Sequence, residues 1–255
     1  MANAALVPVF AYEFPASSSG LGTTVADVSG AGNAGTATGF PGGTGGGLST
    51  DIPAGFTGNS VIFIPGTRIV TNAIDLLASQ TVADNGGFTY DVWIKITSLP
   101  TGTARHKIID YGGVEHLRTV ASGKVEFVVG TGVAATTDAL SMNTWHHVVA
   151  QFDSQGNAAV ADTTYTGNFK LAGVSKLWVD GVGYMPVATT KTGQSDSLNR
   201  GIGVGSHPTS TTESFGGLIY NPTVSLSVPE PGSLVLCGLA LAGLAMRRRP
   251  MSRLW

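Results

Sequence analysis

Alternation of apolar and polar residues is the clearest pattern along the chain, and it predicts β-strands. In the stretch FTYDVWIKI (residues 88–96) every second residue is apolar, and the residues between them are Thr89, Asp91, Trp93 and Lys95. Because successive side chains of a strand point to opposite faces, one face of this strand is wholly apolar and the other is mixed. Such a strand suits a sheet that packs only one face against a partner sheet.

Further runs of this kind predict further strands. They are VFAYEF at 9–14, SVIFI at 60–64, KVEFVV at 124–129, WHHVVAQF at 145–152, KLWVDG at 176–181, GIGVG at 201–205 and FGGLIY at 215–220. Turn residues separate the runs, and the pair Asp180-Gly181 predicts a two-residue hairpin. Many strands with almost no helix predict an all-β fold, an antiparallel sandwich of two sheets.

One stretch predicts a helix instead. Ile69, Ala73, Ile74 and Leu77 recur at near-helical spacing within residues 67–80, so we expect one short helix there.

Glycine is concentrated near the beginning of the chain. Between Gly20 and Gly58 lie 13 of the 36 glycines, and we expect a long loop or a pair of loops without regular structure over roughly residues 20–58. No Lys-Ser or Lys-Thr follows these glycines, which argues against a phosphate-binding loop.

Composition and charge narrow the class of protein. The 255 residues are enough for one large all-β domain. The net charge is −2, and four of the 14 Lys and Arg residues fall within the last nine positions. The rest of the chain is therefore more acidic than the total suggests, which argues against nucleic acid as a partner. Cys237 is the single cysteine, so the sequence excludes an intrachain disulfide.

The order of three strand motifs resembles a known family. FTYDVWIKI, WHHVVAQFD and KLWVDG, followed by a late FxG-type strand, resemble the laminin G-like, concanavalin A-like jelly roll over roughly Val9 to Leu226. The resemblance implies one domain at residues 1–226. We expect Trp145 to begin an inner strand and pack in the core, and Asp180 and Gly181 to form a tight turn.

The C-terminal segment resembles a second family. A Val-Pro-Glu-Pro motif is followed by an apolar run at 233–246 and by three arginines. The motif residues are Val228, Pro229, Glu230 and Pro231, and the arginines are Arg247, Arg248 and Arg249. Together they resemble a PEP-CTERM sorting signal over residues 227–249, with a short tail at 250–255. In that family the signal is processed by an exosortase, a membrane protease-transferase of Gram-negative bacteria that make extracellular polysaccharide. The resemblance implies export to the cell envelope, the surface or the extracellular matrix.

The physical properties of the apolar run agree with an envelope signal. As a hydrophobic helix its fourteen residues span about 21 Å, less than the ~30 Å hydrocarbon core, but snorkelling arginines extend its reach. The arginines would stay cytoplasmic and the domain outside, with the C-terminus as a transient membrane anchor before processing. At the front, MANAALVPVF lacks the features of a signal peptide, and Ala2-Asn3-Ala4 fits either the end of a removed one or chance.

Catalytic patterns are weak in this sequence. Retaining glycosidases need two carboxylates close together, and the Glu-x-Asp-x-(x)-Glu pattern of laminarinase-like enzymes is absent among the five glutamates. His146 and His147 are adjacent and face opposite sides of a strand, so we expect structural histidines rather than two ligands of one metal. No Gly-x-Ser-x-Gly elbow is present, although the sequence leaves a Ser-His-Asp arrangement open. We therefore expect no enzymatic activity.

Calcium is the one cofactor that the resemblance raises. Many laminin G-like domains bind one Ca²⁺ at a rim of the sandwich, and Asp110 and Asp138 are loop candidates for such a site. Solvated turn residues are the alternative for both positions, and we assign no metal ligand and no cofactor.

The function that these patterns favour is binding at the cell surface. We expect a non-enzymatic, exported jelly-roll protein that binds polysaccharide or a surface protein and is processed by an exosortase. Trp93 and Trp178 lie at mixed positions and are candidates for a sugar-stacking platform, although each also fits a core residue. A glycan-active enzyme on the same fold and a purely structural surface protein are the alternatives.

Overall fold

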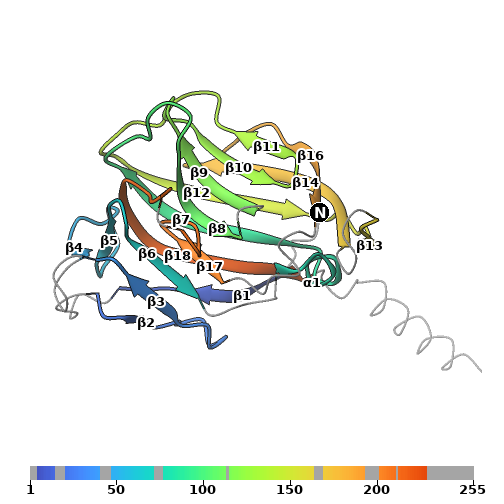
Figure 1. The fold of residues 1–255 in the computed structure, drawn as a ribbon, viewed down its shortest axis with the longest axis horizontal. Helices are drawn as coiled ribbons and strands as arrows, with labels where there is room; N and C mark the ends of the chain where they lie inside the picture. The colour runs from blue at the N-terminus through green and yellow to red at the C-terminus, as the bar shows by residue number, and fades with distance from the viewer. Residues whose placement is uncertain are drawn as a thin grey trace, which may run out of the picture.

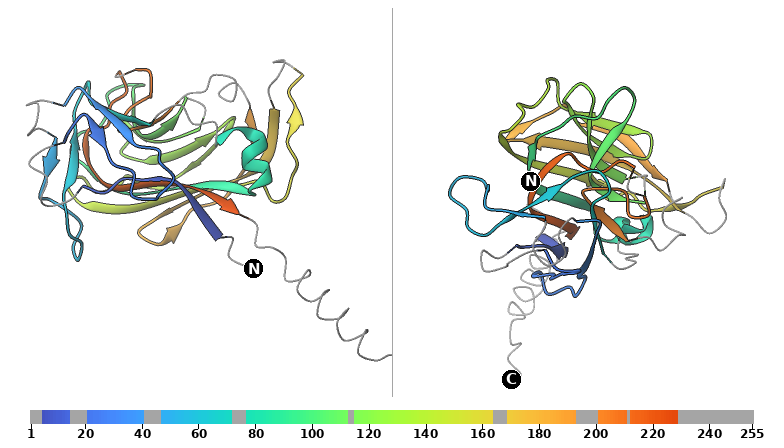
Figure 2. Two further views of the ribbon diagram at one scale, coloured as in Figure 1. Left: turned by 90° about the horizontal axis from the view of Figure 1, so that it is seen from below. Right: turned by 60° about the vertical axis from the view of Figure 1, so that its left-hand side comes forward.

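Two antiparallel β-sheets stacked face to face form the body of the structure (Figures 1 and 2). The structure is a computed structural model, and it describes residues 5–14, 21–40, 47–71, 77–112, 115–163, 169–192, 201–210 and 212–228. Within the described residues, one sheet has ten strands and the other has eight. The sequence-based prediction of an all-β, two-sheet jelly-roll sandwich is confirmed.

The ten-stranded sheet contains the longest strands. Its main order is β13 (Val160–Ala161), β14 (Phe169–Val179), β12 (Trp145–Asp153), β7 (Gly87–Ile96), β18 (Gly217–Val228), β5 (Ser60–Phe63) and β4 (Leu48–Ser49). Three further strands join it at the side, where β1 (Ala5–Ala11) pairs with β18, and β15 (Val182–Gly183) and β16 (Val187–Thr192) pair with β14. The first and the last described strands are thus hydrogen-bonded neighbours, with Ala5 opposite Val228, and Figure 2 (left) shows them side by side.

The eight-stranded sheet covers the other side of the core. Its order is β11 (Gly132–Ala135), β10 (Val125–Val129), β9 (Glu115–Val120), β8 (Arg105–Tyr111), β17 (Ile202–Val204), β6 (Arg68–Thr71), β3 (Gly35–Thr38) and β2 (Thr24–Val25). Strands β8 and β9 were not predicted from the sequence. They carry polar residues among apolar ones, such as Lys107, Asp110 and Glu115, yet these side chains are buried and joined in ion pairs.

Alternate residues of the strands fill the space between the sheets. On β7 the apolar positions of FTYDVWIKI are all fully buried, as the alternation predicted. Phe88 and Tyr90 of β7 contact Phe127 of β10, and Phe88 also contacts Phe152 of β12, with ring centroids 5.2 to 6.0 Å apart. Burial of these large rings contributes to holding the two sheets together.

The predicted helix over residues 67–80 is largely wrong. Arg68–Thr71 form β6, residues 72–76 lie outside the described residues, and helix α1 spans Ser79–Asp84. Ile69, Val70 and Thr71 are β-branched and pair with β3 and β17, so the spacing of Ile69 from Leu77 did not mark one helix face. Among the described residues, no helix has both the length and the hydropathy to cross a membrane.

The glycine-rich stretch is more ordered than predicted. Strands β2, β3 and β4 all lie within it. Gly35 of β3 shows why glycine occurs in a strand here, since an added Cβ would lie 2.5 Å from Ile69 Cγ2 and 2.8 Å from Tyr12 Oη. The missing side chain therefore lets β3 pass close to its neighbours, and the expectation of loops alone was wrong.

Two further expectations concern the Asp180-Gly181 hairpin and the C-terminal end of the domain. Asp180 and Gly181 have φ values of 51° and 78°, and Val179 pairs directly with Val182, so the predicted two-residue hairpin is confirmed. Strand β18 runs to Val228, two residues past the expected domain end at Leu226. The remaining motif residues, from Pro229 to Arg249, and the expected hydrophobic helix lie outside the described residues.

Candidate functional site

The outer face of the ten-stranded sheet, which points away from the core, carries the mixed positions of its strands. The pairing register places these positions side by side, because Thr89 of β7 lies opposite Gln151 of β12, and Val149 of β12 lies opposite Trp178 of β14. Residues two apart on β12, such as Val149 and Gln151, share this face. Three strands thus build one surface from residues that are far apart in the sequence.

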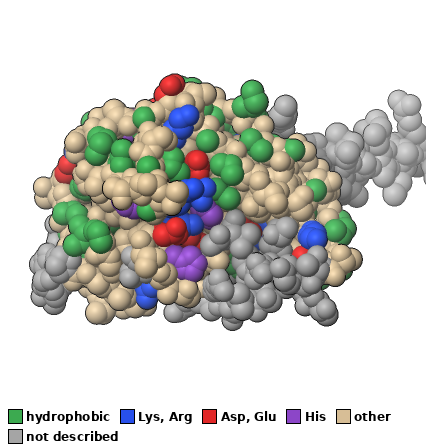
Figure 3. Space-filling view, turned by 45° about the horizontal axis from the view of Figure 1, so that its top comes forward, with side chains coloured by type: hydrophobic (Ala, Val, Ile, Leu, Met, Phe, Trp, Pro, Cys, Tyr) green, Lys and Arg blue, Asp and Glu red, His purple; other side chains and the backbone are tan. Residues whose placement is uncertain are grey.

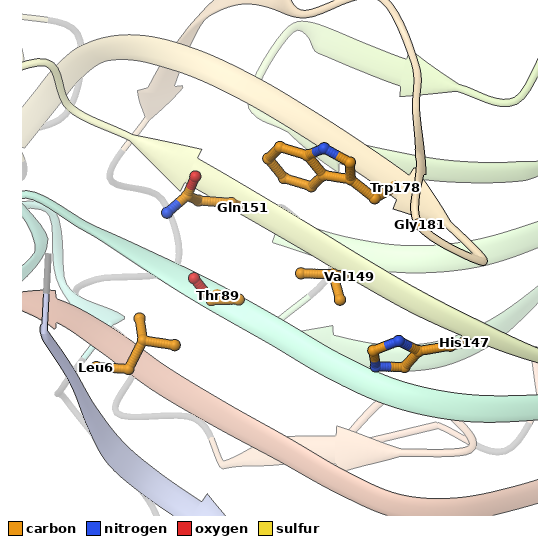
Figure 4. A pocket seen from close by; sticks show the side chains of 7 residues that line it. All are labelled: Leu6, Thr89, His147, Val149, Gln151, Trp178 and Gly181. Carbon is orange, nitrogen blue, oxygen red and sulfur yellow. The ribbon is translucent and has the colours of Figure 1, made fainter. Parts of the chain in front are cut away.

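A pocket of about 520 Å³ lies on this face, and its volume falls in the range of small-molecule sites. We call it the outer pocket, and its lining residues are Leu6, Thr89, His147, Val149, Gln151, Trp178 and Gly181. Figure 4 shows Leu6, Thr89 and Gln151 toward one end and His147 toward the other, with Val149 between them and the Trp178 ring along one side. The lining residues therefore extend along β12 and across the neighbouring strands from β14 to β1.

Three uncharged polar groups in the outer pocket lack partners within the described part of the chain. Thr89 is only 5% exposed, and its hydroxyl has no hydrogen-bond partner there. The side-chain amide of Gln151 and the indole Nε1 of Trp178 also make no hydrogen bond to another described residue. An unpartnered buried hydroxyl costs about 1–3 kcal/mol, and the Thr89 oxygen is itself covered. The half-buried Gln151 amide and Trp178 indole are the groups that can bind a hydroxyl-bearing ligand.

His147 marks the other end of the outer pocket. Its Nε2 lies 2.7 Å from Asp91 Oδ1, and its ring stacks on Trp93 with centroids 4.9 Å apart and planes at 19°. The hydrogen bond with Asp91 raises the pKa of His147, and partial burial opposes this only in part. Sequence reasoning expected a structural histidine here, whereas the structure places it in the pocket wall.

The two predicted tryptophans have different positions. Trp178 lines the outer pocket, whereas Trp93 does not, because His147 stacks on its ring and Phe56 packs edge-on at 5.3 Å. Both side chains are half-buried on the outer face. The structure thus places one of the two candidates where a ligand can reach it and uses the other to support His147.

The expected core position of Trp145 was wrong. On β12 the buried residues are His146, Val148, Ala150 and Phe152, so Trp145 has the opposite parity and lies on the outer face. Its Nε1 donates a hydrogen bond to Asp51 Oδ1 at 2.9 Å. Trp145 does not line the outer pocket.

Ser141, His146 and Asp180 form a connected group beside the hairpin. Ser141 Oγ lies 3.1 Å from His146 Nε2, and His146 Nδ1 lies 2.7 Å from Asp180 Oδ2, which is the connectivity of a Ser-His-Asp array. The same Nε2 lies 3.1 Å from the carbonyl oxygen of Ser141, an acceptor that favours a proton on this nitrogen. Asp180 Oδ1 also accepts the backbone N–H of His147 at 2.8 Å. The group joins the loop before β12 to the hairpin that borders the outer pocket.

Two carboxylates of the described residues share one lysine. Asp110 and Glu213 both bind Lys107 Nζ, at 3.1 and 3.6 Å, so the lysine occupies the space between them and balances their charge. Charged and histidine side chains gather on the face that Figure 3 shows. On the eight-stranded sheet, Arg118 likewise binds Glu126 at 2.7 Å and contacts His116 at 2.9 Å.

The calcium candidates are separated in the structure. Asp110 lies on β8 and is fully buried, so its expected place in a loop was wrong. Asp138 lies in an exposed turn and accepts a hydrogen bond from Thr137. Among the described residues, no group of three or more His, Cys, Asp or Glu side chains could hold a metal ion.

Sequence reasoning missed most of the outer pocket. Thr89 and Gln151 lie at mixed positions of predicted strands, so alternation could assign them to the outer face. The register between the strands, and the contribution of Leu6 from β1, could not be derived from the pattern of any one strand.

Comparisons with known proteins agree with this architecture. Residues 70–225 match the concanavalin A-like lectin/glucanases superfamily, and residues 227–249 match the PEP-CTERM protein-sorting motif. No curated protein matches the sequence.

Solved structures share the fold at low sequence identity. One of them is domain 4 of AbnA, a GH43 extracellular arabinanase from Geobacillus stearothermophilus, in complex with arabinotriose. It is 16% identical to this chain with a TM-score of 0.56, and the match covers 90% of this chain and 96% of the AbnA domain chain. The Trypanosoma rangeli sialidase in complex with 2,3-difluorosialic acid is 10% identical with a TM-score of 0.52, covering 88% of this chain and 31% of the sialidase chain. Because the superfamily match extends over more than half of its residues, the chain belongs to the concanavalin A-like lectin/glucanases superfamily.

Proposed function

We propose that this protein binds carbohydrate in the outer pocket and does not transform it. The observation that carries the proposal is the combination of the Trp178 ring with the unpartnered side-chain amide of Gln151 in one pocket. Aromatic rings stack on the C–H faces of sugars, and uncharged donors and acceptors match sugar hydroxyls. The arabinanase domain of the same fold, which was solved with arabinotriose, supports the proposal by analogy.

The sorting motif gives the place of action. A PEP-CTERM motif implies export and a location at the surface or envelope. We propose that an exosortase of a Gram-negative bacterium processes this chain near Pro229–Pro231, that the apolar run anchors it in the membrane until then, and that the pocket afterwards meets extracellular polysaccharide.

Processing is tested by intact mass and cell fractionation in hosts with and without the exosortase. We expect a shortened, surface-released chain that ends near Pro231 in the first host and a membrane-bound chain that retains Arg247–Arg249 in the second. A chain of the same mass and location in both hosts would show that the exosortase does not act on it.

Binding is tested with a glycan array followed by titration calorimetry of the best ligand. We expect Trp178→Ala to weaken binding at least about tenfold, because aromatic anchors in a pocket carry a large share of binding energy. Trp178→Phe should retain part of the affinity through the ring. Trp145→Ala is the matched control, since Trp145 lies on the same face outside the pocket. Equal losses in the Trp178→Ala and Trp145→Ala variants, or no ligand at all, would argue against the pocket and favour a purely structural surface protein.

The connected group of Ser141, His146 and Asp180 favours one alternative, a glycan-active esterase. The same ligand, incubated with the protein and analysed by mass spectrometry, should keep its length and its acyl groups. Acyl release that Ser141→Ala abolishes would support the enzymatic alternative instead.

A further inference from the structure

Building on the proposed function, we infer that the outer pocket selects an uncharged polysaccharide, with more than one sugar unit bound along β12, and rejects anionic chains. The charges around the pocket, the chemistry of its free groups and its shape support this inference independently.

Every lysine on the described strands of the ten-stranded sheet is paired with a carboxylate. The Nζ–O distances are 2.6 Å for Lys95–Asp51, 3.0 Å for Lys170–Asp162, 2.7 Å for Lys176–Asp153 and 3.3 Å for Lys191–Glu115. These strands contain no arginine. The sheet thus offers no free lysine or arginine to the carboxylate or sulfate groups of an anionic polysaccharide, and His147 in the pocket wall is paired with Asp91 at 2.7 Å.

Lys176 is the lysine nearest to the pocket along the sheet. It lies on β14 two residues before Trp178 and opposite Gln151 of β12. Asp153 holds its Nζ at 2.7 Å, so its charge is compensated beside the pocket rather than directed into it.

Acidic groups border the pocket instead. Asp91 binds His147 at the wall, and Asp180 precedes Gly181 in the hairpin. Their side chains are each 48% exposed, so their charge reaches the solvent at the mouth of the pocket. Residues 1–228 carry ten Lys and Arg against fifteen Asp and Glu, a net charge of −5 with neutral histidines. An anionic chain would approach against this field.

The free hydrogen-bonding groups of the pocket are uncharged. The Gln151 amide can both donate and accept, and the Trp178 indole donates. A sugar hydroxyl also donates and accepts, so it satisfies each of these groups without leaving a charge unpaired in a half-buried site.

The shape of the pocket favours a chain over a single sugar. His147, Val149 and Gln151 follow one another on the same face of β12, and residues four apart on a strand are separated by about 13 Å. This length exceeds one sugar ring, and Figure 4 shows the Trp178 ring alongside the middle of the row.

The test uses the full chain on immobilised polymers of both kinds. The uncharged set is arabinan, xylan, β-glucan, mannan and methyl-esterified polygalacturonate, and the anionic set is polygalacturonate, alginate and hyaluronate. We expect binding only within the uncharged set, at least about tenfold tighter for an oligosaccharide than for its monosaccharide. We also expect affinity to change less than about twofold between ~50 and ~500 mM NaCl, since no ion pair forms.

A charge variant gives the inference a second test. Asp153→Asn releases Lys176 while its amide oxygen still accepts the N–H of Gln155. We expect this variant to gain salt-sensitive binding to polygalacturonate, with its thermal unfolding midpoint as the check on folding. A wild-type protein that binds an anionic polymer, with the binding lost in Trp178→Ala, would overturn the inference and leave the proposed function intact. No binding to any polymer in either set would overturn the proposed function and the inference with it.

Discussion

Two buried hydroxyl groups without partners distinguish one end of the outer pocket at the residue scale. Thr89 on β7 and Ser227 on β18 are 5% and 4% exposed, and neither hydroxyl has a hydrogen-bond partner in the described part of the chain. Ser227 lies opposite Leu6, which lines the same end. Polar groups buried in this way usually find a partner, so these two covered oxygens lower the stability of this end of the sheet.

The Asp91–His147 pair gives a pH dependence at the same scale. Because Asp91 raises the pKa of His147 above 6.5, the protonated ring is favoured in the folded state. The pair therefore makes its full contribution to the free energy of unfolding below about pH 6.5. This contribution is lost as the pH rises through the raised pKa of His147. Both side chains are partly exposed, at 33% and 48%, so we expect at most about 1 kcal/mol.

Urea unfolding between about pH 5.5 and 9 measures this contribution. Asp91→Asn should remove the decline that the wild type shows above pH 6.5. Asp138→Asn is the control, since Asp138 is exposed and its carboxylate bonds only Thr137 in the described structure. If Asp91→Asn left the pH profile unchanged, the pair would have no energetic role.

At the element scale, alternation predicted the central strands of the ten-stranded sheet because each has one buried face. The faces of β7 and β12 follow from a period of two, and so do the outward positions of Trp93 and Trp178. Strand β8 could not be predicted in this way, because ion pairs allow Lys107 and Asp110 to be buried where an apolar pattern would be expected.

The candidate site was less accessible to sequence reasoning than the fold. Trp178 was identified from its position on one strand, but the pocket depends on Gln151 lying opposite Thr89 and on β1 placing Leu6 beside them. Strand order and register arise from long-range pairing, which no local window of the sequence contains.

Strand β3 illustrates how one glycine determines an element within the glycine-rich stretch. In Gly35→Ala the new Cβ would lie 2.5 Å from Ile69 Cγ2 and 2.8 Å from Tyr12 Oη, so one of these side chains must shift. We expect a loss of about 1–3 kcal/mol in the free energy of unfolding, measured by urea denaturation. Gly22→Ala is the matched control, because its Cβ would meet only Thr24 at 3.7 Å, and we expect a change within about 0.5 kcal/mol. Equal effects of the two variants would mean that β3 adjusts without strain.

At the scale of the whole molecule, the last described strand completes the fold. Strand β18 pairs with β7, β5 and β1, and its residues Val224 and Leu226 belong to the core. The first strand depends on it, since Ala5–Ala11 pair with residues 223–228. The sandwich therefore needs the chain as far as Val228, and the sorting motif continues at the next residue.

Two truncated chains test whether the sorting segment is separate from the fold. A chain ending at residue 228 keeps every pair of β18, so we expect the same thermal midpoint and the same glycan affinity as the full chain. A chain ending at residue 222 loses Val224, Leu226 and all partners of β1. Losing each core side chain lowers the free energy of unfolding by about 2–5 kcal/mol, and the total stability of a domain is about 5–15 kcal/mol. We therefore expect the chain ending at residue 222 not to fold.

Near-ultraviolet circular dichroism and thermal scans distinguish the two results. A shorter chain that unfolds cooperatively near the full-length midpoint would show that β18 is dispensable. A loss of folding in the chain that ends at residue 228 would show that the segment after Val228 contributes to the domain. If only the chain ending at residue 222 does not fold, then cleavage near Pro229–Pro231 would release a folded domain. The outer pocket is bordered by β1, which pairs with the end of β18, so the pocket would lie beside the new chain end.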